Sequence, residues 1–185
     1  MVDEKLDVVN EDNEVVGQER RSIIHSSGLW HRGVHVLLFT PDRRLLVQRR
    51  SRAHEAFPGA WDCSISEHLR IGESYLDGAI RGLREELSLG PIPLTHLLRL
   101  KMNYGPNDNM INDLYEGTCR DKSPIPAPDE IERIAFHTVP EIKRMIRSRQ
   151  SSFTPWFVQL LRWYTRQPAD MQVLWKCHER PTGMR

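Results

Sequence analysis

The densest set of residues able to do chemistry in this sequence lies between Ser66 and Leu89, in the stretch SEHLRIGESYLDGAIRGLREELSL. Glu85 and Glu86 are adjacent carboxylates near its end, and Arg81 precedes Glu85 by one helical turn. Two carboxylates on a rigid helix form a hard-oxygen site of the kind that Mg²⁺ or Mn²⁺ prefers, and such an ion can hold a diphosphate. The stretch therefore predicts a metal–diphosphate site.

The same stretch predicts the helix that carries these groups. Gly72 can supply a left-handed turn, and Ser74 followed three residues later by Asp77 is typical of a capping box at a helix start. Apolar residues then recur at helical spacing, at Leu76, Ile80, Leu83 and Leu87. We expect that face to pack on a core, the other side to carry the arginine and both glutamates, and Glu73 to lie at the positive end of the helix dipole.

The stretch resembles the Nudix box, whose pattern is G-x5-E-x7-R-E-U-x-E-E-x-G-U, where U is aliphatic. The matching positions are Glu73, Arg81, Leu83, Glu85, Glu86 and Leu89, and the departures are Glu67, Gly82 and Ser88. The resemblance implies Glu85 and Glu86 as catalytic metal ligands, Mg²⁺ or Mn²⁺ as the cofactor, and Glu73 with Arg81 as a structural ion pair. In the family, the glutamate at the position of Gly82 is a metal ligand and in some members the catalytic base.

Gly82 therefore leaves one ligand position without a side chain. One hypothesis is that Glu67 lends its carboxylate there and joins the catalytic residues; the alternative is that Glu67 points to solvent. Glu67, Asp113, Glu116 and Glu130 all stay open as the general base. For Glu85 and Glu86 the plain alternative is a solvated helix face, with an i,i+4 pair to Arg81 worth about 0.3–0.5 kcal/mol.

The resemblance reaches beyond the box. The segments HRGVHVLLF, LLVQRRS, FPGAWD and FTPWF are similar to a subgroup close to isopentenyl-diphosphate isomerases, over roughly Leu6 to Gln167. It implies that His25, His31 and His68 lie near metal-binding positions and that Asp113 matches a carboxylate ligand. Hydrogen-bonded structural histidines are the alternative.

The arginines Arg49, Arg50 and Arg52 cluster at the end of a predicted strand. Guanidinium forks match phosphate oxygens in bidentate geometry, so Arg50 and Arg49 are candidate substrate contacts, with Arg81 as a third; a solvated strand end is the alternative. The resemblance favours Arg50, whose counterpart in the isomerases binds diphosphate.

The isomerase reaction itself is less well matched. Ser66 stands where the resemblance requires a protonating cysteine, with Cys63 three residues earlier, and Gly82 and His54 stand where it requires an arginine and a lysine. A serine cannot replace a thiol of suitable pKa in that role.

Composition limits the partners and the compartment. The chain has 185 residues, a formal net charge of +1 and three cysteines. Balanced charge gives no field for a nucleic acid polymer or a membrane surface, and an odd, widely spaced cysteine set fits a reducing compartment. With no apolar signal segment near the N-terminus, we expect a cytoplasmic protein with a small-molecule diphosphate partner; whether it forms a homodimer is left open.

The order of predicted elements indicates an α/β (α+β) fold, a Nudix-type α/β/α sandwich with a mixed central sheet. We expect one domain over 1–167, with an N-terminal hairpin at 6–20 and the loop–helix–loop of the box at 66–89, then a tail at 168–185. Strands are expected at 34–39, 45–48, 96–104, 110–119 and 130–138, and helices at 21–27, 140–149 and from Thr154.

The predicted function is divalent-metal-dependent hydrolysis of a phosphoanhydride bond in a nucleoside diphosphate-linked or related diphosphate substrate. The alternatives are a catalytically impaired nucleotide-binding module and, ranked lower, an isopentenyl-diphosphate isomerase.

Overall fold

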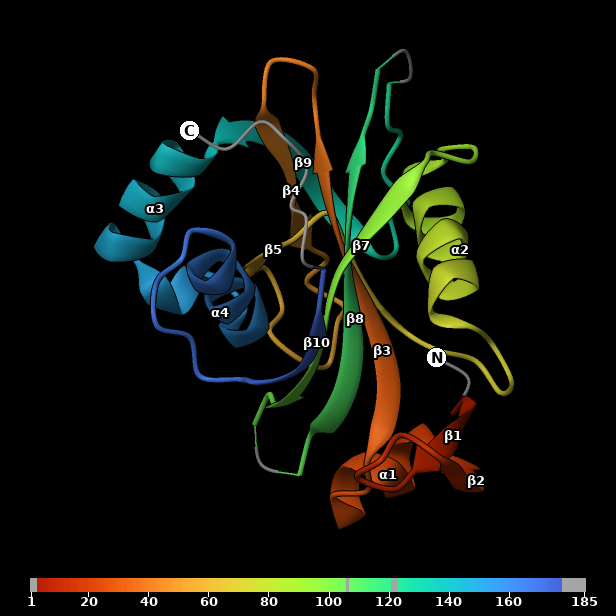
Figure 1. Cartoon of the computed structure of the whole chain (residues 1–185). Coiled ribbons are helices and arrows are strands. Elements are labelled where there is room, and N and C mark those ends of the chain that lie inside the picture. The colour runs from red at the N-terminus through yellow and green to blue at the C-terminus, as the bar shows by residue number, and fades with distance from the viewer. Residues whose placement is uncertain (1–2, 106, 121–122, 178–185) are drawn as a thin grey trace.

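The computed structural model describes residues 3–105, 107–120 and 123–177, and it folds them into a mixed β-sheet covered by helices on both faces (Figure 1). The strands are β1 (Lys5–Val9), β2 (Val15–Arg20), β3 (His31–Phe39), β4 (Arg44–Arg50), β5 (Trp61–Asp62), β6 (Ile65–His68), β7 (Leu94–Asn103), β8 (Asn109–Thr118), β9 (Ile131–Thr138) and β10 (Gln172–Lys176). The helices are α1 (Arg21–Ser27), α2 (Tyr75–Leu87), α3 (Val139–Ser148), the short 3₁₀ helix η1 (Gln150–Ser152) and α4 (Pro155–Tyr164). This architecture confirms the predicted fold class.

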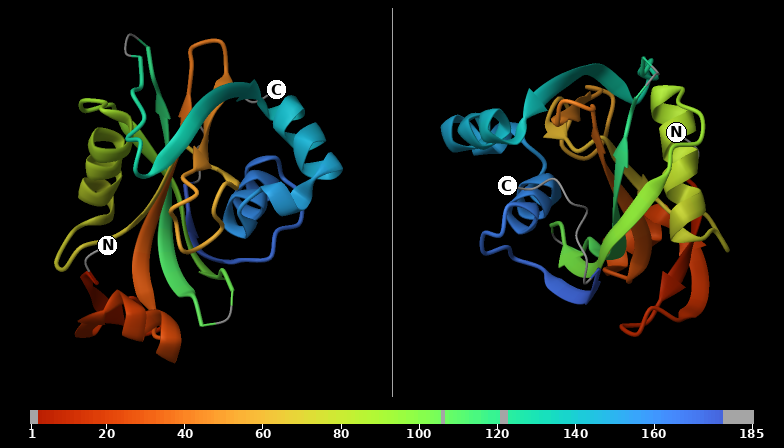
Figure 2. Two further views of the ribbon diagram at one scale, coloured as in Figure 1. Left: turned by 180° about the vertical axis from the view of Figure 1, so that it is seen from behind. Right: turned by 45° about the horizontal axis from the view of Figure 1, so that its top comes forward.

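Strand β3 is the axis of the sheet. It pairs parallel with β8 and antiparallel with β1, β4 and β6, while the long path runs β10-β7-β8-β3-β1-β2. All of β3 except Arg32 is buried, as expected for a strand covered by helices on both faces of the sheet. One core lies under α2 and contains Leu83 and Leu87; the other lies under α3 and α4 and contains Phe157 and Leu161 (Figure 2).

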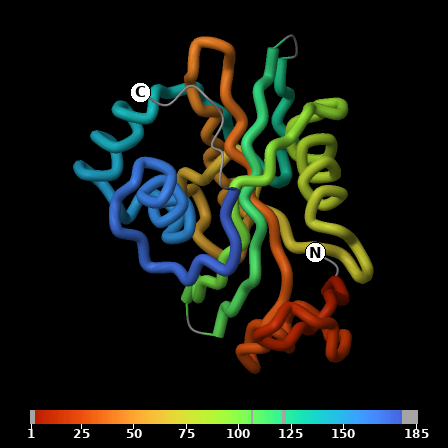
Figure 3. Tube along the Cα trace, in the orientation of Figure 1, coloured from red at the N-terminus to blue at the C-terminus, as the bar shows by residue number. Residues whose placement is uncertain are grey.

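The N-terminal hairpin and α1 gather at one end of β3 (Figure 3). The predicted hairpin is present, and α1 ends at Gly28, whose φ of 66° is the left-handed conformation that favours glycine. The turn into β3 then places His25 of α1 beside the first residue of that strand. None of the helices in the described part of the chain is long and apolar enough to cross a membrane.

Two parts of the fold differ from the prediction. Gln172–Lys176 is a strand, β10, that pairs antiparallel with β7, so the expected tail adds an edge to the sheet; its remainder, 178–185, lies outside the described residues. The short strands β5 and β6 were not predicted either. Strands β5 and β6, of two and four residues, are too short for sequence alternation to identify them, and pairing with longer strands stabilises all three.

Helix α2 begins as predicted and buries Leu83 and Leu87 as predicted, but Tyr75 and Ala79 in place of Leu76 and Ile80. The Ser74 side chain accepts a hydrogen bond from the backbone N–H of Asp77. Its buried apolar residues are Tyr75, Ala79, Leu83 and Leu87, whereas Leu76 is 43% exposed. The helix ends at Ser88, which has a φ of 54°.

We expect Ser88→Gly to stabilise the protein by about 0.5–1 kcal/mol, because glycine adopts a left-handed C-cap without the clash of a Cβ. Thermal unfolding should shift upward by roughly 1–4 °C. Ser148→Gly, at the end of α3, is the matched control and should lower stability by a few tenths of a kcal/mol (~0.5). No gain from Ser88→Gly would mean that the left-handed cap carries no strain.

Candidate active site and metal centre

The buried guanidinium of Arg81 organises the loops around the box. Its Nε and Nη2 donate to the two oxygens of Glu73 at 2.8 and 3.0 Å, and its Nη1 donates to Glu67 and Glu85, each at 3.2 Å. A further bond of 2.8 Å goes to the carbonyl of His68. Burial alone would raise the pKa of Glu73, but these charge-assisted bonds outweigh it and lower that pKa. These five hydrogen bonds match the five N–H donors of the guanidinium, so the geometry gives Arg81 a structural position and leaves no donor for the expected contact to substrate.

Glu67 occupies the space beside Gly82. A Cβ built on Gly82 would lie 2.6 Å from Ile65 Cγ2 and 3.1 Å from Glu67 Cγ. The side chain of Glu67 therefore runs along the helix surface where residue 82 has none, and its carboxylate binds Arg81 instead of pointing to solvent. Desolvation raises the pKa of Glu67, against the opposing pull of the Arg81 charge.

Glu86 is the second buried carboxylate of this site. Its side chain is 6% exposed, and its Oε2 accepts a hydrogen bond of 2.9 Å from Gln48 Nε2 on β4. Its Oε1 is buried and, among the described residues, has no hydrogen-bond partner. Burial, followed by the charge of Glu67, raises the pKa of Glu86 well above its ordinary value. An unpartnered carboxylate oxygen next to a second carboxylate is the donor set that a hard divalent cation satisfies.

The side chains of Glu85 and Glu86 point in different directions. Neighbouring helical residues point about 100° apart, and the Glu85 side chain is 37% exposed and contacts Arg70 at 3.1 Å and Arg84 at 3.6 Å. The expected pair of adjacent carboxylates is therefore split: Glu86 turns inward, where the charge of Glu67 acts on it, and Glu85 faces the arginines.

Asp113 does not lie in the same site as His68, although both were predicted to be metal ligands. Its carboxylate is bound by Arg99 at 2.7 and 2.9 Å and by His96 at 3.2 Å. In the sheet register Asp113 is opposite Val34 and His68 is opposite Gly33, so the two side chains leave the sheet on opposite faces. The structure does not bring Asp113 and His68 into one metal site.

The two predicted arginine contacts, Arg49 and Arg50, lie at the end of β4, next to the loop that leads to β5. Arg50 is 9% exposed; it pairs with Asp62 at 3.3 Å and donates to the Ala56 carbonyl at 3.1 Å. Arg49 donates to the Gly59 carbonyl at 3.0 Å and pairs with Glu132 at 3.4 Å. Both guanidinium groups are fixed by the loop, which preorganises them but leaves few free donors.

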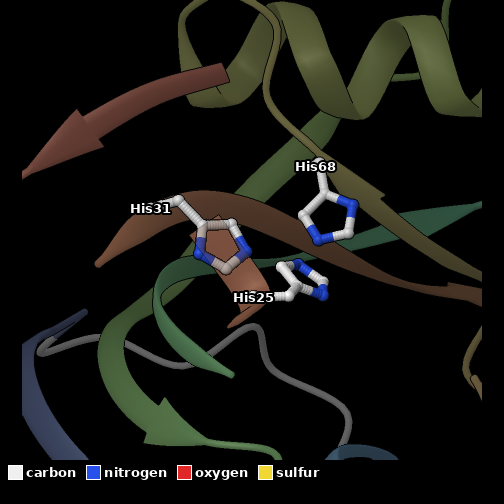
Figure 4. Close-up of side chains that lie close together, drawn as sticks. All are labelled: His25, His31 and His68. Carbon is white, nitrogen blue, oxygen red and sulfur yellow. The ribbon is translucent and has the colours of Figure 1, made fainter. Parts of the chain in front are cut away.

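Three histidines converge near the other side of β6 (Figure 4). The rings of His25, His31 and His68 have centroids 5.1–5.5 Å apart, and one nitrogen of each lies within 4.8 Å of the others. The Nε2 atoms of His25 and His31 lie 3.9 and 3.8 Å from Asp108 Oδ1. Sequence reasoning missed Asp108, because only the folding of the β7–β8 loop brings it here.

This cluster fits a metal ion. Within the described residues, His25 Nε2, His31 Nε2 and Asp108 Oδ1 are buried and have no hydrogen-bond partner. His31 Nδ1 faces the Leu29 carbonyl at 3.3 Å, which favours a proton there and a free lone pair on Nε2. Burial lowers the pKa of His31 to about 4 and that of His68 well below its ordinary value, so the rings stay neutral. Three imidazoles with a carboxylate suit Zn²⁺, Mn²⁺ or Fe²⁺.

The comparison with known families decides the assignment of the chain. The NUDIX domain family matches residues 8–157. This chain belongs to the Nudix family. Among its relatives, an uncharacterised Nudix hydrolase of Streptomyces coelicolor is 32% identical over 155 residues, covering 83% of each chain. An isopentenyl-diphosphate Δ-isomerase of Streptomyces griseus is 30% identical over 162 residues, covering 84% of this chain and 81% of the relative.

Solved structures agree with the Nudix fold. A Deinococcus radiodurans protein has a TM-score of 0.67 at 28% identity, covering 78% of this Nudix chain and 90% of its own. The Nudix domain of Shewanella oneidensis NrtR, crystallised with ADP-ribose, has a TM-score of 0.60 at 15% identity, covering 74% and 87%. The sequence resemblance to the Nudix superfamily and its isomerase-like subgroup is thereby confirmed.

We expect Glu86→Gln to stabilise the metal-free protein at pH 8 and to have little effect at pH 5. The folded-state pKa of Glu86 lies above its ordinary value of 4.5, so the folded protein binds more protons and loses stability as pH rises from 4.5. Thermal unfolding with a chelator at both pH values measures this, with Glu19→Gln as the control for charge. A less stable glutamine variant at pH 8 would contradict the assignment.

We expect the wild-type chain to bind Co²⁺ through the histidine cluster, and His68→Ala to weaken that binding by about 100-fold, since even outer-shell changes cost roughly 10–100-fold. Visible absorption of bound Co²⁺ reports the ligand field and the affinity. His137→Ala, a half-exposed histidine on β9, is the control and should leave the titration unchanged. An unchanged titration in His68→Ala would exclude the cluster.

Proposed function

We propose that this Nudix chain hydrolyses a phosphoanhydride bond in a nucleoside diphosphate-linked or related small diphosphate, with Mg²⁺ or Mn²⁺ as cofactor. The observation that carries the proposal is the buried Glu86, with an unpartnered oxygen, together with the partly exposed Glu67 beside Gly82. ADP-ribose bound to the Nudix domain of NrtR supports a nucleoside diphosphate as the substrate class.

In this proposal, Glu86 and Glu67 would hold the ion, and Gln48 fixes Glu86 through its hydrogen bond. The bound ion supplies charge neutralisation on the phosphates and makes water more acidic. Glu67, whose Cγ lies 3.1 Å from where a Cβ on Gly82 would be, would accept the proton of the attacking water as the water oxygen bonds to phosphorus and the P–O bond of the anhydride breaks to release the leaving phosphate. Arg81 keeps Glu67 in place, and Arg50, with Arg49 beside it, orients the diphosphate. Glu85, exposed toward arginines, contributes less than Glu86.

A second candidate is an isomerase acting on isopentenyl diphosphate. Two observations favour it: the histidine cluster, and relatives named isopentenyl-diphosphate Δ-isomerase that are 25–30% identical to this chain. Against it, Ser66 replaces the required thiol. The nearby Cys63 donates to the Ile65 carbonyl at 3.1 Å and is buried, which raises the pKa of its thiol. We therefore rank hydrolysis first.

The deciding experiment is a substrate panel of nucleoside di- and triphosphates, diphosphate sugars and isopentenyl diphosphate, each assayed with Mg²⁺ and with Mn²⁺. Phosphate release supports hydrolysis, and formation of dimethylallyl diphosphate supports the isomerase. Thermal stabilisation by a nucleotide without any turnover would instead make the chain a binding module.

We expect Glu67→Gln to lower kcat by about 10²–10⁴-fold on the best substrate of that panel, because it removes the proton acceptor while keeping its shape. The acidic limb of the pH–rate profile, which should lie above the ordinary glutamate value because burial raises the pKa of Glu67, should disappear with it. Glu19→Gln serves as the control. Wild-type turnover by Glu67→Gln would remove Glu67 from the mechanism.

A further inference from the structure

Phe57 combines an unfavourable backbone conformation with an exposed aromatic ring. Its φ is 52°, in the left-handed region that bulky side chains rarely adopt, and its side chain is 39% exposed. The Phe57 carbonyl closes a turn by accepting a hydrogen bond of 3.2 Å from the backbone N–H of Ala60, and this turn leaves part of the ring open to solvent. Strained residues of this kind cluster at active sites and ligand contacts, which makes Phe57 a candidate for such a contact.

The position of Phe57 links it to the candidate diphosphate contact. The carbonyl of the preceding residue, Ala56, accepts a hydrogen bond of 3.1 Å from Arg50 Nε. The guanidinium of Arg50 lies 5.6 Å from the ring centroid of Trp156 on α4. The Phe57 ring meets that same indole edge-on, at a centroid distance of 5.2 Å and 88°. Arg50 and Phe57 are thus held against one buried indole.

The loop that carries Phe57 is fixed rather than extended into solvent. In Figures 1 and 2 the segment between β4 and β5 lies beside α4, where Trp156 is located. His54, on the same loop, contacts Arg50 at 3.2 Å and pairs with Glu130 at 3.0 Å. A rigid loop presents the ring in one place, as a selective contact requires.

We propose that Phe57 is a specificity-determining residue that stacks on the base of a nucleoside diphosphate whose phosphates reach Arg50. The aromatic ring can stack on the planar base of the ligand, and the guanidinium group nearby can bind its anionic phosphates. Stacking accepts any base, because each has a π-face. This assignment rests on the proposed function and names the part of the substrate that the carboxylates do not touch.

The test compares two non-hydrolysable probes that differ only by the nucleoside. α,β-Methylene-ADP and methylenediphosphonate are titrated calorimetrically, with Mg²⁺, into wild type, Phe57→Leu and Phe57→Ala. Wild type should bind the nucleotide probe more tightly, and both variants should lose about 10- to 100-fold in that affinity. Affinity for methylenediphosphonate should not change, because the loop and Arg50 remain in place.

Matched controls separate stacking from loop collapse. Trp175→Ala removes another exposed aromatic side chain, 46% exposed on β10 and stacked on His96, and should bind both probes as wild type does. Phe57→Gly should melt higher than Phe57→Ala by roughly 2–4 °C, since glycine relieves the left-handed φ, yet it should lose nucleotide affinity equally.

Three results would overturn the assignment. These are wild-type nucleotide affinity in Phe57→Leu, an equal loss of methylenediphosphonate affinity in the variants, or isopentenyl diphosphate binding as tightly as the nucleotide probe. The outcome is independent of turnover. Loss of stacking in a chain that hydrolyses nothing would leave this inference standing and the proposed hydrolase reaction refuted, whereas turnover with unchanged Phe57→Leu affinity would refute the inference alone.

Discussion

A single buried cation holds the candidate active site together. Arg81 donates to Glu67, Glu73 and Glu85 and to the backbone of β6, so it joins the loop before α2, the helix itself and the neighbouring strand. Buried charges are costly unless they are paired and hydrogen-bonded, and removing one member leaves the others uncompensated. The guanidinium thereby makes the accumulation of acids in this site compatible with folding.

Strand β6 contributes one side chain to each of the two candidate metal sites, because neighbouring side chains of a strand point to opposite faces of the sheet. Glu67 joins the carboxylate site at α2, whereas His68 joins His25 and His31. One site offers hard oxygen donors and the other mainly imidazole nitrogens, so they would select different cations. The short distance along the chain between Glu67 and His68 ties the geometry of the two sites together.

The sequence determined those features that depend on local pattern. Apolar runs and turn residues located the N-terminal hairpin, β3, β4 and the helices, and capping chemistry located the start of α2 at Ser74. The pairing of Glu73 with Arg81 followed from the box resemblance, and the fold class followed from the order of elements. The prediction that Leu76 is buried was wrong. Tyr75 and Leu76 both fit the helical period at an edge of the apolar stripe, and only the packing of the helix decides which of them is buried.

Tertiary structure decided which groups meet. The position of Glu67 beside Gly82 depends on the pairing of β6 with β3, and Asp108 reaches the histidines through the β7–β8 loop. Sequence spacing could not show that Glu86 turns inward and Glu85 outward, because the packing of the helix on the sheet sets its rotation. A sequence states which donors exist; their convergence is a property of long-range contacts, which no local pattern encodes.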